Sequence, residues 1–267
     1  MTTTGTTTRR RPLAALSAAE FTQFRRNKTL VFTALVFPVA MPLGVFLLAS
    51  REGTTAAVAG ATFDMYALFA LMFVQFYTML SLVTTRRGEG VLKRLRTGEA
   101  DDWQILTAPA IPGIAITVAT ATVVAAVVYG FGAPAPVNPL LMVLGLAAGS
   151  VLFALLALAT STFTKNAEAA QITSLPVIAM AMIGAGNIRA ALPERAAELL
   201  GYTPFAAVSD LINLGAAGKT AVAGADTPAA SFAGSFSEIG QPLATLAVWT
   251  VAAIALVYKC FRWDDRG

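Results

Sequence analysis

Residues 103–164 read WQILTAPAIPGIAITVATATVVAAVVYGFGAPAPVNPLLMVLGLAAGSVLFALLALATSTFT and contain no Asp, Glu, Lys or Arg. In the whole chain, 13% of the residues are charged and 56% are hydrophobic. An ordinary soluble domain carries roughly 25% charged residues, because its surface must face water. A water-facing fold of this size cannot leave so long a tract without charge. The sequence therefore indicates an integral membrane protein.

Six apolar runs are long enough to cross a bilayer, since a helix needs roughly 20 apolar residues to span the hydrocarbon core. The uncharged tract holds two of them, separated by a turn that contains Pro134, Pro136 and Pro139. Pro176 predicts a kink in the fifth run, which neighbouring helices can accommodate. The expected fold is all-α, a polytopic membrane protein with six transmembrane helices. The predicted spans are residues 29–50, 65–85, 110–131, 140–163, 169–188 and 243–259.

The basic residues predict the orientation of these spans. With the N-terminus in the cytoplasm, all but four of the 19 Lys and Arg residues fall in cytoplasmic segments. The positive-inside rule therefore places both termini in the cytoplasm. The net charge of +4 is explained by anionic membrane lipids of the inner leaflet, and no nucleic-acid partner is expected. The four exceptions are Arg51, Arg189, Arg195 and Lys219.

Residues 1–28 are expected to form a cytoplasmic tail and an interfacial helix. The Thr-rich residues 1–8 are predicted to be disordered, and Pro12 is a favourable first residue for a helix. Four apolar side chains share one face of that helix, which is typical of a helix that lies in the membrane surface. The alternative is a solvated basic tail. The four side chains are Leu13, Leu16, Phe21 and Phe24.

The loop after the second span reads RRGEGVLKRLR, residues 86–96. Gly88 and Gly90 permit a sharp turn there. After the turn, an apolar arc of Val91, Leu92 and Leu95 faces one way, and basic side chains face the other. Such a short helix can lie along the membrane and contact a cytoplasmic partner. A basic anchor that follows the positive-inside rule and has no partner is the alternative.

This loop, between the second and third of six spans, resembles that of the permease subunits of the ABC-2 family of bacterial exporters, particularly the drug-resistance type. The similarity extends over nearly the whole chain and implies a type V exporter-like fold in residues 29–267. It also implies that residues 86–102 are a coupling loop, which docks into a groove of an ATP-hydrolysing subunit. The coupling residues implied are Glu89, Val91, Leu92, Lys93, Arg94, Leu95 and Arg96.

A second part of the resemblance lies in the outer segment, residues 189–241. The stretch YTPF at 202–205, followed by DLIN at 210–213, is similar to the end of a family signature, but Ala207 stands where Ser, Tyr or Arg is usual. Two short helices, 192–200 and 204–214, are expected to form a re-entrant hairpin whose outer gate contains Pro204 and Phe205. A plain extracellular loop is the alternative.

Polar side chains inside the predicted spans are few. Gln75, midway along the second span, predicts either a helix–helix hydrogen bond or a contact with substrate. Asp64, at the outer start of that span, is expected to cap the helix rather than to bind a cation. The proposed substrate path is lined by Phe73, Gln75, Phe76, Tyr77 and Met79.

No chemistry is expected of this chain itself. Histidine is absent, which removes the commonest metal ligand and general base. The only cysteine, Cys260, excludes an intramolecular disulfide. The sequence GKT at 218–220 lacks the first glycine of a phosphate-binding loop, since Asn213 occupies that position. We therefore expect no catalytic residue, no metal site and no bound cofactor, with ATP and Mg²⁺ bound by the partner ATPase.

The function implied is that of a permease subunit of an ATP-driven exporter in the bacterial plasma membrane. It would work with two copies of an ATPase and with a second copy of itself or a close relative. An apolar or amphipathic substrate, such as an antibiotic or other drug, is expected, with a lipid or lipid-linked glycan as the alternative. A proton-coupled transporter would need charges within the membrane, and the predicted spans hold essentially none apart from Asp64 at the boundary of the second span. A membrane anchor without transport would have no ATPase partner.

Overall fold

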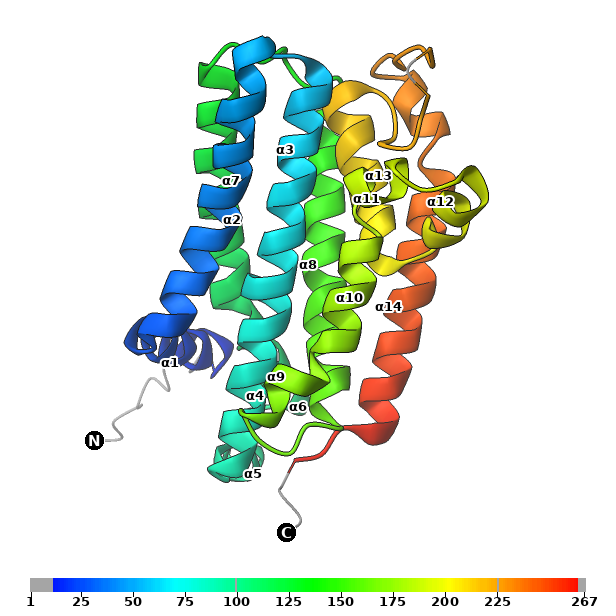
Figure 1. Cartoon of the computed structure of the whole chain (residues 1–267). Coiled ribbons are helices and arrows are strands. Elements are labelled where there is room, and N and C mark those ends of the chain that lie inside the picture. Colours follow the sequence, from blue (N-terminus) through cyan, green and yellow to red (C-terminus); the bar gives the residue numbers. More distant parts are fainter. Residues whose placement is uncertain (1–11, 99, 225, 264–267) are drawn as a thin grey trace, which may run out of the picture.

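The computed structural model describes residues 12–98, 100–224 and 226–263. In that part of the chain every regular element is a helix, and the long helices run side by side in one bundle (Figure 1). Helix α1 (Pro12–Arg26) and the last turn of α14 (Gly240–Cys260) lie at the same end, which we name the proximal end. The opposite end is the distal end. The all-α prediction is confirmed, whereas the predicted disordered tail lies outside the described residues.

Five helical stretches among the described residues are long and apolar enough to cross a membrane. Polar side chains cap three of these stretches: Asn27, Thr55 and Asn138 each accept a hydrogen bond from a backbone N–H in the first turn that follows. The stretches are α2 with η1 (Lys28–Ala49, Ser50–Glu52), α3 with η2 and α4 (Ala56–Phe69, Ala70–Tyr77, Thr78–Gly88), α6 with α7 (Asp102–Thr107, Ala110–Gly130), α8 (Pro139–Ser161) and α14.

The second predicted span begins nine residues earlier than expected, at Ala56. The predicted span was started after Asp64, because a carboxylate is costly in hydrocarbon. In the structure this side chain is buried between helices, so the apolar run continues past it. The result is one continuous rod of α3, η2 and α4 from the distal to the proximal end (Figure 1). Its middle section, η2, is a π-helix.

The fifth predicted span, 169–188, is broken. It consists of α9 (Ala169–Thr173) and α10 (Leu175–Ile183), followed by α11 (Gly186–Ala190) and α12 (Glu194–Leu200). Pro176 explains the first break, because its ring nitrogen cannot donate to a carbonyl of the preceding turn. The chain leaves the helical path again at Ala185, which has an extended conformation. None of these four helices is long enough to cross a membrane by itself.

Helix α13 (Pro204–Ala217) is the most enclosed element of the bundle. All of its residues are buried, and it contacts α3, α8, α10 and α14. It begins inside the bundle, where Phe205 meets Phe153 of α8 edge-to-face, and runs toward the distal end (Figure 1). The prediction of two short helices is confirmed by α12 and α13. The alternative of a plain extracellular loop is wrong for residues 204–217.

Glycines allow α13 to approach α8 closely, as is common where helices pack without large side chains between them. A Cβ atom on Gly215 would lie 2.7 Å from the carbonyl oxygen of Asn138 and 2.9 Å from the backbone nitrogen of Met142. Neither backbone atom can move away easily. The approach also lets the Asn138 N–H donate to the Gly215 carbonyl at 2.8 Å.

We therefore expect Gly215→Ala to destabilise the protein by about 1–3 kcal/mol through overpacking. Gly44→Ala is the matched control, because a Cβ at that position of α2 meets nothing within 4 Å. Thermal unfolding of the purified variants in detergent measures the difference. Equal melting temperatures for the two variants would show that α13 and α8 do not pack as closely as described.

Candidate functional site

The loop at the proximal end turns sharply at Gly90, whose φ of 68° lies in the left-handed region that favours glycine. Helix α5 (Val91–Arg96) follows, and Figure 1 shows it at the proximal end of the bundle, below α4. The predicted turn and short helix are both present. Gly88, the other predicted hinge, instead closes α4 in helical conformation.

The two faces of α5 have different surroundings. Leu92 is 1% exposed and belongs to the core of the chain itself, and Leu95 packs against that core. The side chains of Lys93 and Arg94 in α5 are exposed, and Glu89, the C-cap residue of α4, is exposed beside them. The apolar arc therefore attaches α5 to its own bundle, and it is the charged face that is accessible to a partner.

Arg96 is fixed by neighbours on two other elements. Its side chain forms an ion pair with Asp102 of α6 at 3.3 Å and lies over the ring of Trp263 at 4.8 Å. Val91 is half-buried. These contacts hold α5 against α6 and the residues that follow α14.

Two buried arginines connect this loop to the rest of the proximal end. Arg86 forms an ion pair with Glu20 of α1 and donates to Oε1 of Gln23 at 3.2 Å. Arg87 donates to the carbonyl oxygens of Ser161, at 2.7 Å, and of Thr164, at the end of α8. A cation is favourable there because the free carbonyls of a helix C-terminus carry partial negative charge. The end of α4 is thus linked to both α1 and α8.

The sequence interpretation placed both arginines among the basic residues that orient the chain, and it did not find these links. Burial raises the pKa of the Glu20 carboxyl to about 7, although the Arg86 guanidinium beside it acts in the opposite direction. A signal was present in the sequence, since Glu20 is the only acidic residue in α1. Nothing in the spacing, however, pairs residues 20 and 86.

The residues predicted to line a substrate path lie inside the chain. Gln75 is fully buried in η2, and neither of its side-chain polar atoms has a hydrogen-bond partner among the described residues. It faces Gly113 of α7, where a Cβ would lie 3.0 Å from its Oε1. Phe76 and Met79 are also buried. Phe73 stacks on Phe37 at 5.2 Å between ring centroids.

Tyr77, the remaining member of that set, is half-buried. Two cavities of about 700 and 540 Å³ are lined by other residues and by none of these five. The two predicted gate residues, Pro204 and Phe205, are buried at the start of α13, within the bundle rather than at its distal end. The structure therefore does not bring these residues together into a site within one chain.

A buried charged pair that sequence reasoning missed lies beside α13. Arg189 of α11 donates to both carboxylate oxygens of Asp210, at 2.5 and 3.2 Å. It also donates to the carbonyl oxygens of Gly184, at 3.1 Å, and Ala206, at 3.4 Å. Bidentate contacts of this kind are the strongest hydrogen-bonded pairs in proteins. Arg189 was interpreted as a basic residue of an outer loop, because no local pattern indicates that residue 189 returns to the core.

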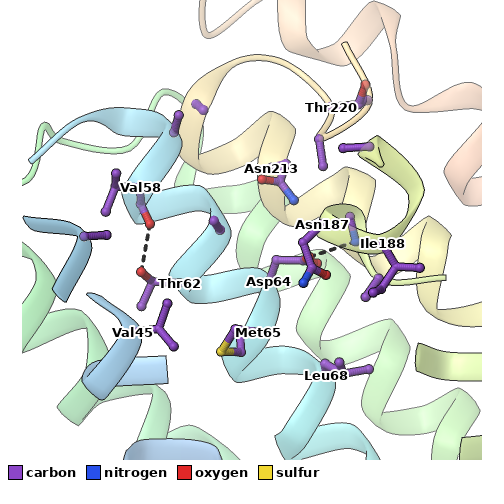
Figure 2. A pocket seen from close by; sticks show the side chains of 18 of the residues that line it. Val45, Val58, Thr62, Asp64, Met65, Leu68, Asn187, Ile188, Asn213 and Thr220 are labelled. Atoms are coloured by element: carbon purple, nitrogen blue, oxygen red, sulfur yellow. Dashed lines mark hydrogen bonds between the residues drawn. The ribbon is translucent and has the colours of Figure 1, made fainter. Parts of the chain in front are cut away.

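Asp64 has a different role from the one predicted. Helix α3 is capped by Thr55, whereas Asp64 lies in the third turn and is buried. Its Oδ2 accepts a hydrogen bond of 3.0 Å from the backbone N–H of Gly186, at the start of α11 (Figure 2). The carboxylate therefore connects the continuous α3 rod to the broken segment, and the prediction that it caps its own helix is wrong.

A model of the ABC-2 type transporter family matches residues 11–193, which is more than half of the chain. The chain belongs to the ABC-2 type transporter family. The match extends from α1 to α11 and includes the whole loop 86–102. A comparison with curated proteins finds no match.

Membership of the ABC-2 family establishes several general properties of this chain. The chain is a multi-pass membrane protein, and ABC-2 membrane domains are the permease part of ABC transporters rather than their ATPase. Their normal partner is an ABC ATPase. The resemblance found in the sequence is thereby confirmed for the family. Its drug-resistance type, the coupling residues and the absence of a bound cofactor stay predictions.

The raised pKa of Glu20 predicts a pH effect on the stability of this ABC-2 protein. The folded protein holds a proton on this carboxyl more tightly than the unfolded chain, where the ordinary value is 4.5. Between about pH 4.5 and 7, this group therefore makes folding less favourable as the pH rises. Relative to wild type, Glu20→Gln should gain in melting temperature from about pH 5 to about pH 8. Glu168→Gln, an exposed carboxyl at the same end, should show no such trend, and a flat difference for Glu20→Gln would contradict the assignment.

The Arg189–Asp210 pair predicts strong coupling between its two partners. Arg189→Met alone leaves a buried carboxylate without its cation and should cost about 3–5 kcal/mol of stability. The double variant Arg189→Met, Asp210→Leu should recover most of that loss, because neither charge remains. A double-mutant cycle by thermal unfolding measures the coupling. Additive losses would show that the two side chains do not depend on each other.

Proposed function

We propose that this chain is the permease subunit of an ABC exporter in a bacterial plasma membrane. A separate ATPase, present in two copies, binds ATP and Mg²⁺ and docks at the proximal end, which faces the cytoplasm. A second copy of this chain or a close relative completes the complex, because one chain offers one docking loop. The cargo is a hydrophobic or amphipathic molecule, with antibiotics and other drugs ahead of lipids and lipid-linked glycans.

The observation that carries the proposal is the attachment of α5. Its exposed face presents Lys93 and Arg94 at the proximal end, next to the exposed Glu89 of the preceding turn, and its apolar face is fixed to the core by Leu92. A docking helix must be rigidly connected to the spans that it moves. The contacts of Arg86 and Arg87 make that connection to α1, α4 and α8.

The route of the movement follows from the same contacts. Closure of the two ATPases would displace α5, and α4 would transmit this displacement along the rod to α3 at the distal end. Helix α8 moves with it, because Arg87 holds the carbonyls at its end. Since α13 contacts both α3 and α8, a change in their angle alters the distal half of the bundle. Transport is then a shift between two conformations that ATP biases.

In this arrangement, α10 and α13 together make the sixth crossing. Helix α10 follows α9 upward from the proximal side, and α13 continues to the distal end (Figure 1). The next long helix, α14, returns to the proximal end, which puts both ends of the chain on the cytoplasmic side. Broken helices occur at membrane depth where their backbone is buried in protein, and α13 is buried along its whole length.

Substitution of the exposed basic side chains of α5 is the most direct test of ATPase docking. We expect Lys93→Glu with Arg94→Glu to abolish binding of the ATPase, because reversing two charges at a complementary surface costs several kcal/mol. The permease is purified in mild detergent from its producing cells, and copurifying ATPase is identified by mass spectrometry and quantified for each variant.

The matched control is Arg25→Glu with Arg26→Glu, a reversal of two exposed charges at the end of α1. This variant should keep its ATPase. If the α5 variant binds as much ATPase as the control, α5 is not the docking helix. If wild-type protein carries no ATPase at all, a proton-coupled transporter or a membrane anchor explains the chain better.

A further inference from the structure

A cavity of about 700 Å³ opens in the distal half of the bundle, among α2, α3, α11 and α13. Its walls are mostly apolar, with Phe46 from α2 and Met65, Leu68 and Phe69 from α3. The volume lies within the range of pockets that hold drug-sized molecules. Figure 2 shows Asp64 beside Asn187, with Asn213 above them in the view, and all three residues line this cavity. The cavity thus combines apolar walls with one carboxylate and two amides.

The carboxylate of Asp64 is only partly satisfied by the protein. The side chain is 4% exposed, and its Oδ1 has no hydrogen-bond partner among the described residues. The hydroxyl of Ser209, which lies on the same side of Gly186, is a neutral polar group close to this carboxylate and acts on it as a hydrogen-bond donor. A carboxylate left in this state is costly, because burial removes the water that would otherwise solvate it.

Among the described residues, the charged side chains around Asp64 are those of Arg189, Asp210 and Lys219. The guanidinium of Arg189 is held by both oxygens of Asp210, so this cluster contains two carboxylates and one guanidinium. The ion pairs between described residues do not include Asp64. Lys219 also lines the cavity, from the loop that follows α13, and it has an interaction of its own.

We propose that this cavity binds an amphipathic organic cation, whose charged group sits against Asp64 and whose apolar body fills the space between α2 and α3. A buried carboxylate is stabilised most by a charge-assisted contact with an opposite charge. A metal ion fits less well, because no group of three or more acidic or cysteine side chains gathers anywhere in the described residues. As a substrate class, this assignment rests on the proposed exporter function.

The binding itself is testable without the ATPase. The permease alone is reconstituted in lipid nanodiscs, and saturable binding of tritiated tetraphenylphosphonium is measured above that of empty nanodiscs. This probe carries a permanent charge and a bulky apolar body. We expect Asp64→Asn to weaken binding by about tenfold or more. Glu52→Gln, which removes an exposed carboxyl at the same end, should leave binding unchanged.

A second variant covers the case in which Asp64→Asn does not fold. Ala61 lines the cavity but is exposed, so Ala61→Trp fills the space, keeps Asp64 and leaves the core intact. It should also weaken binding by about tenfold. The proposal is overturned if wild-type protein shows no saturable binding, or if the folded variants bind as wild type does. Failure to find an ATPase would instead remove the exporter function and leave the binding result standing.

Discussion

The bidentate contact between Arg189 and Asp210 is the interaction on which the distal half of the bundle depends. A segment of short helices leaves backbone N–H and carbonyl groups without partners at each break, and lipid cannot supply those partners. Arg189 uses its remaining donors for the carbonyls of Gly184 and Ala206, which lie at the end of α10 and in the first turn of α13. One side chain thus neutralises a carboxylate and donates hydrogen bonds to backbone carbonyls on both sides of the break between α10 and α13. Asp64 provides the matching acceptor for the N–H of Gly186.

Much of the fold could be predicted from the sequence, because hydrophobic length is a strong signal in a membrane protein. The runs that became α2, α7, α8 and α14 were found to within a few residues. The predicted span boundaries were wrong where a polar residue interrupts an apolar run in the sequence. Asp64 made the predicted second span begin too late, since sequence alone does not show that Gly186 supplies a partner. The break near Pro176 was expected as a kink, but the burial of α13 depends on contacts with α3, α8, α10 and α14.

The candidate site was less predictable for a physical reason. A helical wheel shows which side chains share a face, but it does not show what that face meets. The arc of Val91, Leu92 and Leu95 was correct as a pattern, yet it packs on its own chain, because residues distant in sequence cover it. In the same way, Gln75 faces Gly113 of α7 rather than a passage. Pairs such as Glu20 with Arg86 are separated by more than sixty residues, and no local rule connects them.

The proximal loop and the distal cavity are joined by one uninterrupted helical path. Asp64 and Arg87 lie on the same rod, roughly 35 Å apart at 1.5 Å per residue, and the π-helix η2 lies between them. A π-helix is a less stable conformation than an α-helix and is often found at functional sites. Return of η2 to α-helical geometry would rotate one end of the rod relative to the other. The unpartnered amide of Gln75 sits within that section, so little hydrogen bonding of this side chain opposes such a rotation. The same rod that leads into α5 therefore also carries the carboxylate of the cavity, so the two sites lie on one continuous helical element.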